Sequence, residues 1–313
     1  MTDFDPTRHS IGWIGAGRMG YAMAERLAKA GCDIAVYNRT RSKAEPLADA
    51  GAVIVDAPAL LAGRDIVFTM VAASDDLLEV ISGPQGVLSG SGGPPAIFID
   101  CTSVSEEASA QARADVGRVG AAFLAAPVSG NDHVVKAGKL SIVASGPRET
   151  YDEVEGYLEI LGRGASYVGE GELARFCKIS HNVLLGIVIQ SLVEITVLAE
   201  KAGVPRHAFL EFINNSVMGS MFTRYKTPAL VNLDYTTTFT PPLLRKDLDL
   251  GLSAARKYEV PMPLAVTTRE IIQTLIGNGY RDTDFATLLE LQAKASNLEL
   301  VAEDVDVGTG LED

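Results

Sequence analysis

The chain has 313 residues, of which 47% are hydrophobic and 21% are charged. It is too long for one modest core and too apolar to be disordered, so two domains are the expectation. Lys and Arg number 27 and Asp and Glu number 40, which gives a formal charge of −13. This balance excludes nucleic acid and anionic membrane surfaces as general partners, because both require a cationic footprint.

The cysteine pattern and the N-terminus indicate the compartment. Cys32, Cys101 and Cys177 are odd in number and lack CxxC spacing, which favours free thiols in a reducing compartment over a disulfide framework or a zinc site. The N-terminus has no basic region followed by an apolar stretch, and no unbroken apolar run approaches the roughly 18 residues that span a bilayer. These features predict a soluble, cytoplasmic protein without a metal.

Short apolar runs alternate with amphipathic stretches over the first half of the chain. This rhythm predicts a parallel sheet with helical crossovers, that is, an α/β domain of the Rossmann-type doubly wound class over residues 1–170. The runs that we expect to form strands lie at 11–15, 34–38, 53–55, 66–71, 96–100, 123–128 and 140–146.

The remainder, residues 171–313, has helical periodicity and predicts an all-α domain. A stretch of about 30 residues from Glu172 contains no proline, and Gly203 with Pro205 is a typical helix stop. We therefore expect a long interdomain helix that enters the second domain. From about residue 297 the chain holds six acidic residues and no Lys or Arg, which predicts a loose acidic tail. Further helices are predicted at about 206–215, 243–258, 261–277 and 284–296.

A glycine-rich turn follows the first apolar run and precedes an amphipathic helix. Gly15, Gly17 and Gly20 form GxGxxG, in which the glycines permit a tight turn, close approach to a pyrophosphate and close helix packing, in that order. The uncapped N–H groups of the following helix would face the phosphate charge. The predicted dinucleotide site comprises Gly15, Ala16, Gly17, Arg18, Met19 and Gly20.

The end of the second predicted strand indicates which dinucleotide binds. An acidic residue at this point would accept hydrogen bonds from the ribose hydroxyls of NAD. The chain instead has Asn38, Arg39 and Thr40, and a guanidinium with neighbouring donors suits a 2′-phosphate. NADP(H) is the predicted cofactor, with NAD as the alternative if Arg39 is only a solvated residue at a loop edge.

A second constellation lies where the two predicted domains meet. Lys178 and Asn182 follow Gly169 and Gly171 and are four residues apart, so on a helix they share one face. A helical lysine is ordinarily a solvated surface residue, but this one is flanked by Phe176, Cys177 and Ile179. Apolar surroundings favour the uncharged amine, which a general acid/base near neutral pH requires.

Four ordered motifs carry a resemblance to a known family: GxGxxG with Met19, APVSG at 126–130, Lys178 with Asn182, and KDL at 246–248. From residue 11 to about residue 298 the chain resembles the β-hydroxyacid dehydrogenases, which include 3-hydroxyisobutyrate dehydrogenase and tartronate semialdehyde reductase. The resemblance implies that Lys178 exchanges a proton with the substrate's β-oxygen while hydride passes between the β-carbon and the nicotinamide.

The resemblance implies roles for other positions as well. Ser129 and Gly130 match the donors that take the substrate carboxylate, and Asn182 matches a residue that helps to hold the substrate. Lys246 matches a lysine of the helical domain near both substrate and nicotinamide. Positions that match cofactor contacts in the loops after two strands are Val71, Ala72 and Ser103.

The chain departs from the family pattern directly after Gly130. Asn131 stands where the family usually has a second glycine, and Asp132 and His133 follow it. These polar side chains fit a different or more polar substrate, or a carboxylate clamp that includes the side chain of Asn131. His133 is a catalytic candidate, but a loop histidine more often faces solvent or caps a helix. His181 is predicted to be structural.

The leading interpretation is an NADPH-linked oxidoreductase that interconverts a short β-hydroxyacid and its semialdehyde or keto form, with a small carboxylate as substrate. Imine reductases look similar but commonly carry Asp or Tyr at the position of Lys178. A non-catalytic dinucleotide-binding protein would not need this lysine. The long helix is apolar on more than one side, and together with the resemblance this predicts a homodimer or homotetramer formed through the helical domain.

Overall fold

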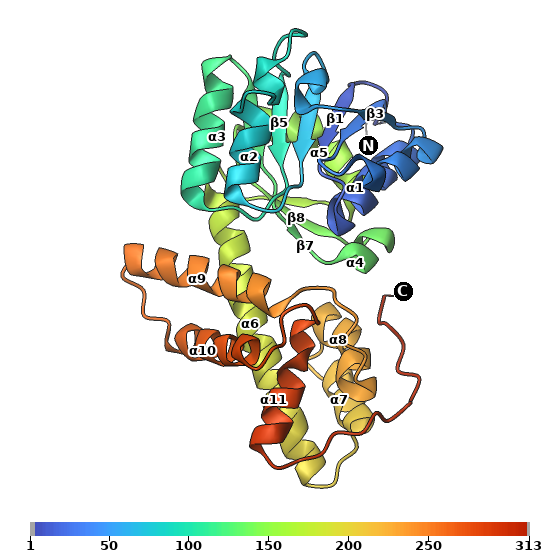
Figure 1. Ribbon diagram of the computed structural model, residues 1–313, viewed down its shortest axis with the longest axis vertical. Coiled ribbons are helices and arrows are strands. Elements are labelled where there is room, and N and C mark those ends of the chain that lie inside the picture. Colours follow the sequence, from blue (N-terminus) through green and yellow to red (C-terminus); the bar gives the residue numbers. More distant parts are fainter. Residues whose placement is uncertain (1–3, 312–313) are drawn as a thin grey trace. The chain divides into compact units, whose positions relative to one another are not determined.

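The computed structural model describes residues 4–311 and divides into two compact units (Figure 1). The first unit is Met1–Lys178 and the second is Ile179–Asp313. The division falls inside the long helix α6 (Leu173–Lys201), whereas the change in sequence periodicity placed it at residue 170. The first turns of α6 belong to the first unit because the side chain of Arg175 is buried there.

A parallel sheet of six strands forms the centre of the first unit, in the order β3-β2-β1-β4-β5-β6. The strand order reverses on either side of β1, which is the doubly wound pattern of dinucleotide-binding folds. The predicted Rossmann-type fold is therefore confirmed. The strands are β1 (Ile11–Ile14), β2 (Ile34–Tyr37), β3 (Val53–Val55), β4 (Ile66–Thr69), β5 (Ile97–Asp100) and β6 (Ala122–Ala125).

Helices cover both faces of this sheet (Figure 1). One core packs α1 and α5 against it through residues such as Leu27 and Tyr157, and the other packs α2 and α3 through Leu77 and Val116. The helices are α1 (Arg18–Lys29), α2 (Ser74–Ser82), α3 (Glu106–Arg118), α4 (Asp132–Lys136) and α5 (Arg148–Leu161), with 3-10 turns η1 (Arg41–Lys43), η2 (Glu45–Ala50), η3 (Pro58–Leu61) and η4 (Val87–Ser89).

A second, smaller sheet contains β7 (Val128–Ser129), β8 (Ser141–Ala144) and β9 (Ala165–Tyr167). The strand expected at 123–128 is divided at Pro127 between the two sheets, because a proline has no N–H with which to continue the ladder. The strand expected at 140–146 joins the smaller sheet, where β7 and β8 pair antiparallel. The prediction of one parallel sheet through these runs was wrong.

The second unit is all helical around the C-terminal part of α6. Helix α8 was not expected from the sequence, because Pro228 interrupts its pattern. It begins with a reciprocal capping box in which Ser220 and Thr223 bond each other's backbone N–H. The elements are α7 (Arg206–Asn215), α8 (Met221–Asn232), α9 (Pro241–Lys257), α10 (Pro263–Gly277), η5 (Phe285–Thr287) and α11 (Leu288–Ala295).

The C-terminal segment is held against the second unit. The carboxylate of Glu303 accepts from the backbone N–H groups of Arg206 at 2.7 Å and His207 at 2.8 Å, which begin α7. The side chain of Asn232 bonds both the N–H and the carbonyl of Val305. The expectation of a loose tail was therefore wrong for the part of the segment that the structure describes, because one acidic side chain caps a helix.

Helix α6 is long and apolar enough, by length and composition alone, to cross a membrane. It contains an 18-residue window with a mean hydropathy of 1.9, although the sequence has no unbroken apolar run of that length. Half of this window is buried inside the protein. Because the core helix of a folded domain passes the same test, we interpret α6 as the core of the second unit.

Candidate functional site

The glycine-rich turn between β1 and α1 has the geometry of a phosphate cradle. Gly15 has a φ of 103°, and a Cβ there would lie 2.2 Å from the carbonyl oxygen of Met70. A Cβ at Gly20 would lie 2.1 Å from the Gly15 carbonyl oxygen, so larger residues do not fit at either position. A Cβ at Gly17 would meet nothing within 4 Å. The open space beside Gly17 is where a pyrophosphate would approach the backbone.

The N-terminus of α1 faces this space without a side-chain cap. Gly17 is the N-cap residue and makes no side-chain hydrogen bond, and the first turn holds no acidic residue. The first N–H groups of the helix are thus suited to an anionic ligand. Of the predicted turn residues, Arg18 begins the helix, whereas Ala16 is buried and Met19 packs partly buried against the core. These residues fit the diphosphate of a dinucleotide.

Asn38 and Arg39, both predicted as donors to the 2′-phosphate of NADP, have different surroundings. The side chain of Asn38 accepts from Ala16 N–H at 2.8 Å and donates to the Thr40 carbonyl at 2.7 Å, so it joins the glycine turn to the loop after β2. The side chain of Arg39 is 81% exposed, and its guanidinium lies 3.1 Å from a carboxylate oxygen of Asp76. Arg39 is therefore accessible to a phosphate, with an acidic residue beside it.

The loops after β4 and β5, which contain the other predicted cofactor contacts, are bonded to each other. The backbone N–H of Val71 donates to the hydroxyl of Thr102 at 3.1 Å. Ala72 follows Val71 and is exposed, and Ser103 follows Thr102. Because β1, β4 and β5 are adjacent parallel strands, their carboxyl ends meet at one edge of the sheet. The predicted cofactor residues of three loops therefore share that edge.

The predicted carboxylate site lies between β7 and α4. Gly130 has a φ of 143°, and a Cβ there would come within 2.8 Å of Val134. Asn131 is the N-cap of α4, and its side-chain oxygen accepts from the Val134 N–H at 3.0 Å. The departure from the family pattern at Asn131 thus supplies a helix cap next to Ser129 and Gly130.

Asp132 and His133, the polar residues that follow Asn131, lie within α4. Asp132 lies 3.7 Å from Lys136 in an (i, i+4) ion pair. His133 is exposed on the same short helix. Within residues 4–311 the imidazole of His133 has no carboxylate partner of the kind that holds a general base in place.

Helix α6 carries Lys178, which is half-buried, and Asn182 one turn later, which is buried. In the second unit, the amide of Asn182 donates to the carboxylate of Asp247 at 2.6 Å and its oxygen lies 2.9 Å from Nδ1 of His181. The ammonium of Lys246 lies 3.6 Å from the other oxygen of Asp247. Asp247 is 4% exposed and was missed as a site residue, although it follows Lys246 directly in the KDL motif.

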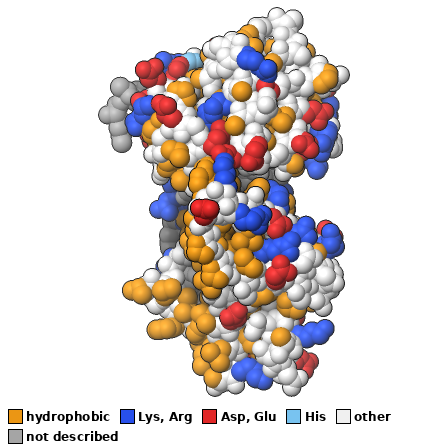
Figure 2. All heavy atoms as spheres, turned by 90° about the vertical axis from the view of Figure 1, so that its left-hand side faces the viewer, with side chains coloured by type: hydrophobic (Ala, Val, Ile, Leu, Met, Phe, Trp, Pro, Cys, Tyr) orange, Lys and Arg blue, Asp and Glu red, His pale blue; other side chains and the backbone are white. Residues whose placement is uncertain are grey.

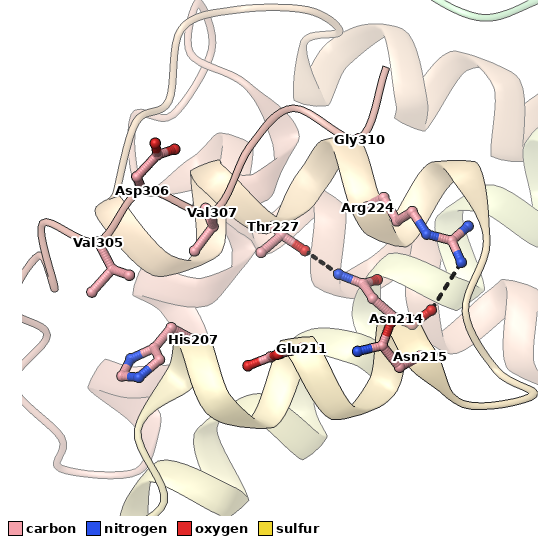
Figure 3. A pocket seen from close by; sticks show the side chains of 10 residues that line it. All are labelled: His207, Glu211, Asn214, Asn215, Arg224, Thr227, Val305, Asp306, Val307 and Gly310. Atoms are coloured by element: carbon pink, nitrogen blue, oxygen red, sulfur yellow. Dashed lines mark hydrogen bonds between the residues drawn. The ribbon is translucent and has the colours of Figure 1, made fainter. Parts of the chain in front are cut away.

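A separate pocket of about 460 Å³ lies in the second unit (Figure 3). Helices α7 and α8 and the C-terminal segment line it, and none of the predicted site residues does. Two bonds join lining residues: the Asn214 amide donates to Thr227 at 2.8 Å, and Arg224 donates to the Asn214 carbonyl at 2.9 Å (Figure 3). Within residues 4–311, no cluster of His, Cys, Asp and Glu side chains has an arrangement that could hold a metal ion.

Two family matches cover most of the chain. Residues 10–169 match the NAD-binding domain of 6-phosphogluconate dehydrogenase, and residues 172–292 match the NAD-binding family of NADP-dependent 3-hydroxyisobutyrate dehydrogenase. The chain belongs to the β-hydroxyacid dehydrogenase family. Membership in this family makes it an NAD(P)-dependent oxidoreductase that acts on CH–OH groups, as the motifs implied.

Individual members of the β-hydroxyacid dehydrogenase family align over nearly the whole chain. Glyoxylate/succinic semialdehyde reductase 2 of Arabidopsis thaliana is 30% identical over 291 residues, with 93% of this chain and 81% of the relative covered. The structure of 3-hydroxyisobutyrate dehydrogenase from Mycobacterium tuberculosis, with L-serine, superposes with a TM-score of 0.78 at 23% identity, covering 90% of this chain and 98% of that one.

An imine reductase of Myxococcus stipitatus, in complex with NADP⁺, shares the fold more distantly. Its TM-score is 0.58 at 21% identity, with 90% of this chain and 99% of that chain covered. At this level of identity the comparison concerns the fold alone.

Proposed function

We propose that this chain is an NADPH-linked oxidoreductase that interconverts a short β-hydroxyacid and its semialdehyde or keto form. The observation that carries the proposal is the pair Lys178 and Asn182 on consecutive turns of α6, with the amide of Asn182 held by the buried carboxylate of Asp247. A protein that only binds a dinucleotide has no need of a lysine followed by a fixed amide.

Lys178 is the general acid and base of the proposed reaction. NADPH, when bound, supplies the hydride that the carbonyl carbon receives. In the reducing direction the ammonium of Lys178 donates a proton to the carbonyl oxygen, which yields the alcohol and a neutral amine. In the oxidising direction the neutral amine takes the hydroxyl proton while the same carbon gives up its hydride to the oxidised cofactor, and the ammonium is restored.

The remaining site residues orient a small carboxylate. The second amide hydrogen of Asn182 is directed by the bond that the first makes to Asp247. In the first unit, Ser129 and Gly130, with Asn131 beside them, offer backbone and hydroxyl donors for the carboxylate. In the second unit, Lys246, next to Asp247, is the cation that the family motif assigns to the substrate. Local cations can hold an anionic substrate even though the chain as a whole carries −13.

The preference for NADP over NAD is part of the proposal and rests on Arg39. Its guanidinium is exposed at the end of β2, where NAD-selective folds place a carboxylate. Thr40 follows it, and the loop is fixed by Asn38. A planar guanidinium can bond two oxygens of a 2′-phosphate, which is absent from NAD.

The decisive test is Lys178→Ala beside the wild type, assayed with a panel of short β-hydroxyacids, semialdehydes and cyclic imines and with NADP(H) and NAD(H). We expect turnover to fall by a factor of about 10² to 10⁴, because proton transfer is lost, while the Kd of NADPH stays within about threefold of wild type. Lys201→Ala, at the last residue of the same helix, is the matched control and should retain turnover. Undiminished turnover in Lys178→Ala, or a preference for cyclic imines in the panel, would exclude the proposal.

We also propose that the protein is cytoplasmic and forms a homodimer or homotetramer through the second unit. Large apolar side chains are exposed on the second unit, and Figure 2 shows hydrophobic side chains gathered on one face. The free thiols of the three cysteines fit a reducing compartment. Sedimentation should give at least a dimer, and Leu198→Glu, on the exposed side of α6, should shift it toward the monomer. A wild-type monomer at working concentration would contradict the proposal. The exposed apolar residues include Leu184, Ile195, Leu198, Leu264 and Val266.

A further inference from the structure

Arg175 has one of the largest wholly buried side chains of the first unit, with 1% of its surface exposed. Its guanidinium is bonded at every nitrogen. Nη2 lies 2.5 Å from the carboxylate of Asp100, Nη1 donates to the Thr102 carbonyl at 2.5 Å, and Nε donates to the Ser109 hydroxyl at 3.0 Å. A buried arginine of this kind fixes the backbone positions of whatever it contacts.

The contacts of Arg175 lead into the loops that are predicted to bind the cofactor. Asp100, the last residue of β5, also accepts from the Thr69 hydroxyl at 2.6 Å and from the Thr102 N–H at 3.1 Å. The hydroxyl of Thr102 in turn accepts from the N–H of Val71. One buried network therefore joins the ends of β4 and β5 to the first turns of α6.

Lys178 lies three residues after Arg175, on the next turn of the same helix. The distance between Lys178 and the edge of the sheet is therefore determined by how the first turns of α6 are fixed. Arg113 fixes the start of this helix from the α3 side, with bonds to the Gly171 carbonyl at 2.7 Å and to Glu172 at 2.9 Å. Arg175 is the arginine that reaches the strand ends.

We propose that Arg175 is a positioning residue that sets Lys178 at the correct distance from the nicotinamide by tying α6 to the cofactor loops after β4 and β5. The inference rests on the proposed function, because it assumes that Lys178 transfers the proton. Displacement of a reacting group by about 1 Å lowers the rate on the order of 100-fold. Loss of the two bonds that the Arg175 guanidinium makes to Asp100 and Thr102 would allow Lys178, on the next turn of the helix, to move by about this distance.

The test is Arg175→Lys, which keeps the positive charge but lacks the planar fork that reaches Asp100, Thr102 and Ser109 together. We expect a folded protein whose NADPH Kd is within about threefold of wild type and whose kcat falls on the order of 100-fold. The primary isotope effect with NADPH deuterated at the transferred position should rise, because the chemical step becomes rate-limiting. A merely structural role would lower the Tm without changing the isotope effect.

Arg113→Lys is the matched control, because it weakens the start of the same helix while its one strand contact is to the Phe123 carbonyl within β6, not to the ends of β4 and β5. It should lower the Tm and leave kcat within about threefold of wild type. If Arg175→Lys does not fold, Ser109→Ala removes only the bond to Nε and should lower kcat several-fold with the same rise in isotope effect.

Two results would overturn the inference. The first is a wild-type kcat and isotope effect in folded Arg175→Lys or, if that variant does not fold, in Ser109→Ala. The second is a loss of kcat in Arg113→Lys as large as the loss in Arg175→Lys. These failures are distinguishable from failure of the proposed function. If Lys178→Ala abolishes turnover while Arg175→Lys does not reduce it, the proposed function stands and the positioning role fails. If Lys178→Ala retains turnover, both fail.

Discussion

Asn182 and Asp247, which are 65 residues apart in sequence, form a buried hydrogen bond of 2.6 Å in the second unit. The bond joins α6 to α9 and fixes which way the amide of Asn182 points. Since the other amide hydrogen then has only one direction, Asp247 determines where Asn182 can donate to a substrate.

Asp247→Asn should therefore impair substrate binding. The new amide can donate as well as accept, so the orientation of Asn182 is no longer fixed, and we expect the KM for substrate to rise on the order of tenfold with a smaller fall in kcat. Steady-state kinetics at saturating NADPH measures both. Asp249→Asn, on the same helix but paired with Arg269, should leave both constants unchanged. An unchanged KM in Asp247→Asn would mean that this bond has no role in the site.

Gly17→Ala should separate cofactor binding from stability. Its Cβ meets nothing within 4 Å in the structure, so the Tm should not fall, but the methyl group would occupy the space that a pyrophosphate approaches. The Kd of NADPH should rise on the order of 100-fold, because backbone contact with the phosphates is lost. Fluorescence titration measures this. Gly117→Ala, on α3 with equally open surroundings, should not change the Kd, and equal behaviour of the two variants would show that the turn does not bind the cofactor.

The selectivity for NADP should depend on both Arg39 and its neighbour Asp76. Arg39→Ala should raise the KM for NADPH on the order of tenfold and hardly change that for NADH, since only the 2′-phosphate needs the guanidinium. Asp76→Asn should lower the KM for NADPH, because it removes a negative charge from the side chain that pairs with Arg39. Arg41→Ala, whose side chain pairs with Asp56, is the control. Equal effects on NADPH and NADH would contradict the assignment.

The hydrogen bonds between the Glu303 carboxylate and the first N–H groups of α7 should make the stability of the second unit fall at acidic pH. Burial raises the pKa of Glu303, but the hydrogen bonds from His207 and Arg206 lower it by more, so the pKa lies below its usual value. A lowered pKa in the folded state stabilises the protein above the unfolded value of about 4.3, and this contribution is lost as the pH falls below it.

Glu303→Gln should thus destabilise the protein by about 1 to 3 kcal/mol at pH 7, and by less once the pH is below the lowered folded-state pKa of Glu303, where the wild-type carboxyl is itself protonated. Chemical denaturation at pH 7 and at an acidic pH below that pKa measures the difference. Glu299→Gln, exposed in the same segment, should have no effect at either pH. A Glu303→Gln deficit that persists unchanged at low pH would show that the carboxylate charge does not matter.

The local features of the site could be predicted from the sequence. The steric needs of Gly15 and Gly20 depend only on a strand that turns directly into a helix, and the alternation of apolar runs determined the order of β1 to β5 along the chain. The likeness of Lys178, Asn182 and the KDL motif to a family likewise required no coordinates. Helix α8 escaped prediction because its start depends on a capping box and its interior contains Pro228.

The partners of the charged and amide groups were decided only by the tertiary structure. Nothing in the local sequence pairs Arg175 with Asp100 across 75 residues or Glu303 with Arg206 across 97. The composition made the C-terminal acids appear as solvated charge, whereas one of them caps a helix. Periodicity and glycine sterics act within a few residues and can be read from the chain, but a buried polar group is stable only where folding brings a complementary group to it.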